Sequence, residues 1–456
     1  MPVENAWRVI LVYRLIDMNS TTLKNPQEGL RTVVFSPSPM GIFEQSLALQ
    51  ERGWLGTMAV DYYADLGSPK FKWLPDGRVK TYLRKRYHPP INARQVRTRL
   101  LPAVLTKIGL SRARSNAARY RWVFWHNLQF DRWVAAHLLQ FGNLAFGYES
   151  ASLFTFQRAA KLGIPRVLYQ PIACAEKATM LLDEEARLFP QLADTLRYNY
   201  FPEGELERRR EERRLADAIF CASRFTKQSL IEAGVEASRI IVEPYGVDQS
   251  VFAPSADKFE QFSVVWASSY TQTKGIGYLL EALAREPVPG LELVLAGYPY
   301  GTDAVALYEK RIRVRRLGHI ARSELARVMG RCHVHVFPTL IEGFGRNLIE
   351  AMASGLPVIT TPHCAGPDLI EDGVTGFIVP IRDVEAICEK LAWIYDHPQE
   401  AIQMGERARA SVTHLTQADY RRRFAERVYH VWQSSPLPER SSSDRRVASP
   451  GNLEVA

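Results

Sequence analysis

Two glutamates, Glu342 and Glu350, frame the part of the sequence whose residue types are best suited to chemistry. Glu342 lies in a turn with Gly343 and Gly345, and Glu350 lies on the helix that we expect to begin near Gly345. Carboxylates accept hydrogen bonds from neutral hydroxyl groups such as those of a sugar or a ribose. Glycines let a ligand approach the backbone, and the N–H groups at the start of a helix favour a diphosphate. This pattern predicts that both carboxylates face one sugar-nucleotide ligand.

The elements around this turn are those of a doubly wound α/β domain. Strand-like runs occur at 262–267, 291–296, 333–337 and 358–361, with helical patterns between them. The helix after the turn ends near Gly355, where Pro357 follows and begins the next run. Strands that alternate with helices predict a parallel sheet.

A similar pattern precedes this domain in the chain. Strand-like runs occur at 32–35, 121–125, 144–148 and 166–169. A turn that contains Gly41 follows the first run, and a helical pattern at 43–49 follows the turn. The charged stretch 175–214 is helix-rich, and we expect its helices to flank a cleft. The first half of the chain is therefore predicted to form a second parallel sheet.

Breaks in composition divide the chain into five parts. The proline and glycine at 244–248 are typical of a hinge between domains, and residues 434–456 contain almost no large apolar side chain. We expect an N-terminal extension at 1–30, an N-terminal Rossmann-like acceptor domain at 31–248, a C-terminal Rossmann-like donor domain at 249–405, helices that pack back on the N-terminal domain at 406–433, and a disordered tail at 434–456.

These segments resemble glycosyltransferase family 4, a retaining family with the GT-B fold. Glu342 and Glu350 match the Glu-x7-Glu signature of that family. Further matches follow in order at 216–223, 244–248, 274–282, 317–320 and 373–380. The resemblance implies an α/β protein in which two facing Rossmann-like, doubly wound domains enclose a cleft.

The resemblance also implies roles for individual residues. Glu342 and the neighbouring backbone amides would hold the donor sugar, Glu350 would bind the ribose, and Lys274 would bind the diphosphate. The other donor-side candidates are Gly343, Phe344, Gly345, Arg346, Ser268, His319 and Ile320. A lysine and the dipole of a helix start stabilise a leaving diphosphate without a metal. We therefore expect Glu342 and Lys274 to be catalytic, and we expect neither a metal nor a cofactor.

Two positions depart from the family pattern. Many members have an arginine six residues before the lysine, where this chain has Ser268, and Arg346 is an alternative phosphate cation. Many members have a histidine at the end of the fourth N-terminal strand, where this chain reads Gly-Tyr-Glu-Ser at 147–150. The acceptor-side candidates are therefore Gly41, Tyr148, Glu149 and His126, which we expect at the end of another strand.

Composition limits the class of protein further. The 456 residues are 46% hydrophobic, enough for two cores, and the five cysteines include no Cys-x-x-Cys pair. The start of the chain lacks the order of a signal peptide, and no apolar run is long enough to span a membrane. We expect a cytoplasmic protein that is either soluble or peripheral on the inner face of the plasma membrane.

The positive charge of the chain is concentrated in one segment. Residues 77–130 contain thirteen lysines and arginines and no aspartate or glutamate, although the net charge of the whole chain is only +9. Aromatic residues are interleaved with these bases, which favours an anionic membrane surface as partner for residues 78–122; a merely solvated surface is the alternative. The segment lacks the known nucleic-acid-binding motifs, so we expect no nucleic-acid partner.

These observations predict a retaining, metal-independent hexosyltransferase. Its donor would be a nucleotide diphosphate sugar, with a UDP-sugar favoured, and its acceptor a lipid-linked glycan or a polysaccharide in glycan or cell-envelope biosynthesis. One alternative is a nucleotide-sugar epimerase of GT-B architecture, because one fold serves several chemistries. Another is a non-catalytic homologue that binds sugar nucleotides, which Ser268 and the missing histidine at 147–150 would suit.

Overall fold

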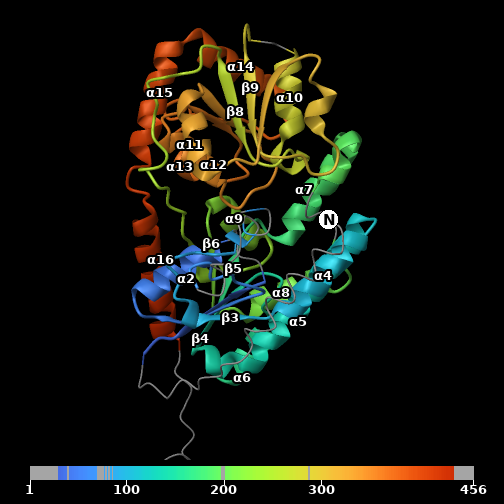
Figure 1. Ribbon diagram of the computed structural model, residues 1–456, viewed down its shortest axis with the longest axis vertical. Coiled ribbons are helices and arrows are strands. Elements are labelled where there is room, and N and C mark those ends of the chain that lie inside the picture. The colour runs from blue at the N-terminus through green and yellow to red at the C-terminus, as the bar shows by residue number, and fades with distance from the viewer. Residues whose placement is uncertain are drawn as a thin grey trace, which may run out of the picture.

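The computed structural model describes residues 29–37, 41–68, 77, 80, 83–84, 86–196, 201–285 and 288–435. Within these residues, two parallel sheets form the centres of two α/β domains, which lie one above the other in Figure 1. Apart from residues 29–30 and 434–435, the expected N-terminal extension and C-terminal tail lie outside the described residues, as do Arg78 and Lys85 of the basic segment.

The N-terminal sheet contains seven strands of the described chain, in the order β3-β2-β1-β4-β5-β6-β7. Their bounds are β1 (Thr32–Ser36), β2 (Leu55–Val60), β3 (Val96–Thr98), β4 (Leu144–Tyr148), β5 (Arg166–Gln170), β6 (Ala218–Cys221) and β7 (Ile240–Val242). All neighbours are parallel. The order reverses between β1 and β4, and the crevice at such a reversal is where open α/β sheets bind ligands.

Helices and short 3₁₀ turns connect these strands. They are α2 (Ile42–Glu51), η2 (Ala93–Gln95), α4 (Leu100–Arg112), α5 (Asn116–Phe141), α6 (Leu153–Lys161), α7 (Ala175–Leu188), η3 (Pro190–Thr195), α8 (Glu205–Leu215), α9 (Arg224–Glu232) and η4 (Ala237–Arg239). The helices α7 and α8 lie in the stretch 175–214, where a helix-rich region was predicted.

The C-terminal sheet contains six strands of the described chain, in the order β10-β9-β8-β11-β12-β13. They are β8 (Ser263–Ala267), β9 (Glu292–Ala296), β10 (Arg313–Gly318), β11 (Val334–Phe337), β12 (Val358–Thr360) and β13 (Phe377–Ile378). The connecting elements are η5 (Gln272–Lys274), α10 (Ile276–Arg285), η6 (Ala304–Leu307), α11 (Arg322–Arg331), α12 (Arg346–Ala353), α13 (Gly366–Leu369), α14 (Val384–Asp396) and α15 (Pro398–Ser411). Here the order reverses between β8 and β11.

The central strands are buried on both faces, as parallel strands covered by helices must be. Every residue of β1, β4, β9 and β11 is buried. The two sheets therefore have separate apolar cores, and the predicted fold of two Rossmann-like domains is confirmed.

One predicted strand is wrong. Residues 121–125 lie inside α5, a 26-residue helix that begins after Ser115, whose side chain accepts a hydrogen bond from Ala118 N–H. The aromatic and β-branched residues of this run suggested a strand. However, the buried positions of α5 recur at helical spacing, with Phe130, Val134 and Leu138 in the core. Packing of that face overrides the local β propensity.

The last described helix, α16 (Gln417–Ser434), returns to the N-terminal domain. In Figure 1 it descends from the C-terminal domain along the side of the N-terminal one. Its side chains Tyr420, Phe424 and Val428 are buried in the core that contains Phe146 and Phe220. The Phe424 ring lies edge-on to the other two phenyl rings, at 5.3 and 5.5 Å.

Candidate functional site

The turn after β11 has a backbone that requires glycine at two positions. Gly345 has a φ of 84° and directly precedes α12, so a left-handed residue starts the helix. At Gly343, a side chain would collide with the Pro171 carbonyl oxygen, just beyond the end of β5 in the N-terminal domain. Gly343, three residues before α12, therefore lies next to the end of the N-terminal sheet.

Lys274 and Glu342, which are 68 residues apart, form an ion pair between Lys274 Nζ and Glu342 Oε2. Lys274 ends the turn η5 beyond β8, and Glu342 follows β11, so the reversal of strand order brings them together. The other carboxylate oxygen of Glu342 accepts a hydrogen bond from Gly343 N–H at 2.9 Å. Both side chains remain partly exposed, at 17% and 23%. The pair is thus open to a ligand.

Glu350 lies on α12 and is buried, with 8% of its side chain exposed. Arg322, the first residue of α11, contacts Glu350 Oε1 through Nη2 at 2.7 Å. Burial raises the pKa of Glu350, while Arg322 and then Arg346 oppose that rise. Arg322 was not among the predicted site residues, although it lies two residues after the family-like segment 317–320.

Arg346 lies between the hinge and the buried glutamate. Its guanidinium carbon is 5.6 Å from the centre of the Tyr245 ring, and its charge helps to oppose the rise in the pKa of Glu350. Phe344 is buried and meets the same Tyr245 ring edge-on at 5.4 Å. The hinge residue Tyr245 therefore contacts both Phe344 and Arg346 at the start of α12.

The remaining donor-side candidates lie at the ends of the neighbouring strands. Ser268 follows β8, and its carbonyl oxygen accepts a hydrogen bond from Trp266 Nε1 at 3.0 Å. His319 is exposed and its ring lies 6.4 Å from that of Tyr298. Ile320 is half-buried. Ser268 itself carries no positive charge, so it cannot replace the arginine that many family members have at this position.

Of the acceptor-side candidates, the structure brings Gly41 and Tyr148 into contact. His126 was expected at the end of a strand, but it lies within α5 and is buried. Burial, with Arg86 and Lys107 nearby, lowers the pKa of His126 to about 4. Gly41 has a φ of 83° and would place a side chain against the hydroxyl group of Tyr148, which itself donates a hydrogen bond to Gln45.

Glu149 is held by two arginines of α8. Its two carboxylate oxygens contact Arg209 at 2.9 Å and Arg213 at 3.3 Å. The next residue, Ser150, has a φ of 74°, which is uncommon for a residue with a side chain. The end of β4 is thus fixed by ion pairs that the sequence analysis did not foresee, since they join residues about 60 positions apart.

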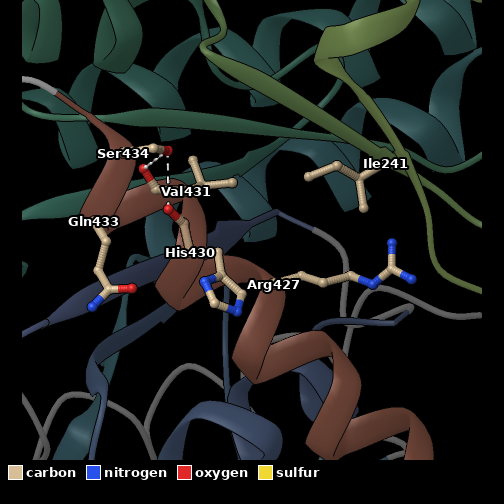
Figure 2. Close-up of a pocket in the computed structure, with 6 residues that line it drawn as sticks. All are labelled: Ile241, Arg427, His430, Val431, Gln433 and Ser434. Atoms are coloured by element: carbon tan, nitrogen blue, oxygen red, sulfur yellow. Dashed lines mark hydrogen bonds between the residues drawn. The ribbon is translucent and has the colours of Figure 1, made fainter.

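Other features of the described residues do not add a site. Within the described part of the chain, no three histidine, cysteine, aspartate or glutamate side chains are grouped so that they could hold a metal ion. None of the described helices is both long and apolar enough to cross a membrane. A pocket lies between Ile241 and the end of α16, lined by Arg427 and His430 among others (Figure 2), and it is separate from the donor-side residues.

Two parallel-sheet α/β domains, with a glycine turn, a helix start and an ion pair at the end of the C-terminal sheet, are the arrangement of the GT-B fold, and comparisons with known proteins agree. A family model described as glycosyl transferases group 1 matches residues 251–411. The C-terminal domain belongs to this family, which is glycosyltransferase family 4.

Curated relatives match part of the chain. The MMP alpha-(1->4)-mannosyltransferase of Mycolicibacterium hassiacum is 28% identical over 207 residues, which are 44% of this chain and 50% of that protein. The D-inositol 3-phosphate glycosyltransferase of Mycobacterium avium is 30% identical over 194 residues, 39% and 45% of the two chains. The chain therefore spans about half the length of the curated relatives it matches.

Solved structures cover both domains. HepE of Anabaena, in complex with UDP and glucose, has a TM-score of 0.59 and 18% identity over 88% of this chain and 100% of that one. Sucrose-phosphate synthase of Thermosynechococcus elongatus has a TM-score of 0.60 and 18% identity over 89% and 100%. At this identity the likeness shows the fold, which is GT-B.

Proposed function

We propose that this protein is a retaining hexosyltransferase that takes its sugar from a nucleotide diphosphate donor, with UDP as the favoured nucleotide. The ion pair of Lys274 with Glu342, at the point where the C-terminal strand order reverses, is the observation that carries this proposal. A donor diphosphate would replace Glu342 as the partner of Lys274. The carboxylate would then be available to the sugar hydroxyls.

The chemistry follows from the charge that the leaving group gains. As the bond between the sugar and the diphosphate breaks, negative charge grows on the diphosphate oxygens. Lys274 and the N–H groups at the start of α12 stabilise that charge, so no metal ion is needed. In this proposal the acceptor hydroxyl attacks from the face that the nucleotide leaves, and the anomeric configuration is retained. Glu350 binds the ribose, which carries no changing charge.

We propose that residues 31–248 form the acceptor domain and residues 249–405 the donor domain. The acceptor would be a lipid-linked glycan or a polysaccharide. The relatives support a role in polysaccharide biosynthesis, since they include the amylovoran biosynthesis glycosyltransferase AmsK of Erwinia amylovora. Transfer to a lipid-linked acceptor requires contact with a membrane, and α4 and α5 suit that contact.

An exposed apolar stripe on α4 supports a membrane-facing role. Leu101 and Leu105 are 67% and 40% exposed, and Ile108 and Arg112 continue the same helix face. Gly109 packs directly against the ring of Trp122 on α5. Exposed apolar side chains among bases are typical of a surface that inserts into the headgroups of anionic lipids.

The start of α5 extends this surface. Trp122 is 37% and Val123 40% exposed, and Arg119 and Arg121 beside them are exposed as well. Residues 77–130 contain no acidic side chain that would repel a negative surface. In the proposal, this face of the acceptor domain rests on an anionic membrane and the cleft receives the lipid-linked substrate from it.

Incubation with a panel of nucleotide sugars tests the proposed reaction. Transferases of this type pass their sugar slowly to water, so the purified protein is expected to release nucleoside diphosphate from one donor above all others. Proton NMR of the released sugar at early times is expected to show the anomer of the donor. Release of nucleoside monophosphate, formation of an epimerised nucleotide sugar, or turnover of none of the panel would reject the proposal.

A further inference from the structure

The helix α7 joins the end of the N-terminal sheet to the core of the C-terminal domain. It begins soon after β5, where the Cys174 N–H donates a hydrogen bond to Ser229 of α9 at 3.0 Å. In Figure 1 it rises from the N-terminal domain beside the C-terminal one. The segment after its last residue packs there, because the half-buried Phe189 ring meets Tyr278 of α10 edge-on at 5.0 Å and the buried Leu192 joins the same core.

Glu185 of α7 is a fully buried carboxylate inside the C-terminal domain. Its Oε1 accepts hydrogen bonds from Gln272 Nε2 at 2.7 Å and from the Tyr278 hydroxyl at 2.8 Å. Its Oε2 accepts one from Arg382 Nε at 2.8 Å. Arg382 has a φ of 67°, an uncommon conformation for a residue with a side chain. Burying a carboxylate is costly unless it is paired and hydrogen-bonded, and here the pairing is complete.

Gln272 links this carboxylate to the turn that carries Lys274. Gln272 begins η5, which Lys274 ends. The side-chain Oε1 of Gln272 accepts a hydrogen bond from Gly277 N–H at 3.0 Å. The backbone N–H of Gln272 donates a hydrogen bond to Thr195 Oγ1 at 2.9 Å. Glu185 and Thr195, which both lie in the first half of the chain, therefore hold Gln272, the first residue of the turn that ends at Lys274.

The other side of the turn rests on the donor motif. The Thr273 carbonyl oxygen accepts hydrogen bonds from Leu340 N–H at 3.1 Å and from Thr339 Oγ1 at 3.2 Å. A side chain at Gly275, which has a φ of 77°, would collide with the Pro338 carbonyl oxygen. The position of Lys274 is thus set between β11 and α7.

We propose that Glu185 is a positioning residue: through Gln272 it fixes the turn that presents Lys274 to the donor diphosphate. This inference rests on the proposed function, because it assumes that Lys274 binds the diphosphate. It also makes the acceptor domain part of the donor site, since α7 starts at the N-terminal sheet. Glu185 itself contacts no substrate.

A double-mutant cycle with UDP as the probe tests this inference. The variants are Glu185→Gln, Lys274→Ala and the combination, and calorimetry measures the dissociation constant of UDP for each. Glu185→Gln is expected to weaken UDP binding by about threefold or more, and this effect is expected to vanish when Lys274 is already alanine. A merely structural role would weaken binding equally in both backgrounds, and would overturn the proposal.

Glu184→Gln is the matched control. Glu184 precedes Glu185 and also pairs with Arg382, at 2.8 Å, but makes none of the contacts to Gln272 that Glu185 makes. The Glu184→Gln variant is expected to leave the affinity for UDP unchanged.

A second variant is available if Glu185→Gln does not fold, as circular dichroism would reveal. Gln272→Met removes the same hydrogen bonds with a side chain of similar size, and it is expected to weaken UDP binding in the same way. If Gln272→Met binds UDP normally, the positioning inference is wrong. If Lys274→Ala binds UDP normally, the proposed function itself fails.

Discussion

Arg322 and Glu350 form an ion pair of 2.7 Å that joins the first residue of α11 to the middle of α12. Glu350 is the buried member, and burial raises its pKa. Arg322 counters that rise and so favours the ionised carboxylate, which is the better acceptor for ribose hydroxyls. The arginine is therefore part of the proposed nucleotide site although the family signature does not include it.

The Arg322→Gln variant is expected to change the pH dependence of UDP binding. Without the cation, the pKa of Glu350 rises further, so protonation begins at a higher pH and affinity is lost earlier as the pH falls. Calorimetry from about pH 8 down to about pH 5 measures this shift. Arg327→Gln, an exposed change on the same helix, is the control. Superimposable pH profiles for wild type and Arg322→Gln would contradict this role.

Removal of the proposed catalytic pair is expected to slow turnover. Lys274→Ala and Glu342→Gln should each lower kcat for donor hydrolysis by at least about tenfold, since each removes a group that stabilises a charged transition state. Lys310→Ala, a change of an exposed lysine in the same domain, serves as the control and should retain the wild-type rate. If Lys274→Ala or Glu342→Gln folds and keeps the wild-type rate, the residue that it replaces is not catalytic.

The Glu350→Ala variant is expected to act on binding rather than on the chemical step. The ribose gains no charge during transfer, so its contacts stabilise ground state and transition state alike. The Michaelis constant for the donor should rise while kcat stays close to the wild-type value. A lower kcat with an unchanged Michaelis constant would be the opposite result. It would indicate that Glu350 acts at the reacting centre and does not bind the ribose.

Transfer is expected to persist in EDTA. Lys274 and the start of α12 supply the positive charge that a divalent cation would otherwise bring. The measurement is the rate of donor turnover before and after dialysis against the chelator. Complete loss of activity that manganese or magnesium restores would show that a metal takes part.

The surface of α4 and α5 is expected to bind anionic vesicles. Each base near such a surface contributes about 1 kcal/mol, so a variant with Arg112, Arg119 and Arg121 changed to Gln should sediment less with phosphatidylglycerol vesicles. A second variant, with Leu101 and Leu105 changed to Ser, tests the apolar contact. The control changes Leu307 and Ile402 to Ser, which are exposed apolar residues of the other domain. Equal sedimentation on anionic and neutral vesicles would leave α4 and α5 as an ordinary solvated surface.

Contiguous patterns made much of the fold predictable. The strands β1, β4, β5, β8, β9, β11 and β12 all occupy runs that the sequence marks by apolar, β-branched residues. The turn at 342–345 was predictable because its glycines and the helix behind it lie within one segment. Alternating strands and helices also predict parallel sheets, and the reversal of strand order explains why Lys274 meets Glu342.

Contacts between distant segments were not predictable. Glu185 lies in a polar helix with no motif around it, and only the docking of α7 into the C-terminal core shows what its carboxylate binds. Arg322 was missed because a single arginine at the start of a helix usually lies in solvent. In α5, the aromatic run at 121–125 has strand propensity, yet the long apolar face of the helix decides its conformation.

A crystal structure with bound UDP would locate the donor site without mutation. The diphosphate is expected within hydrogen-bonding distance of Lys274 Nζ, beside the start of α12, and the ribose hydroxyls at the carboxylate of Glu350. The ion pair of Lys274 with Glu342 should then be broken or shared with the phosphate. Density for UDP at another place, such as the pocket between Ile241 and α16, with this ion pair intact, would show that Lys274, Glu342 and Glu350 do not form the donor site.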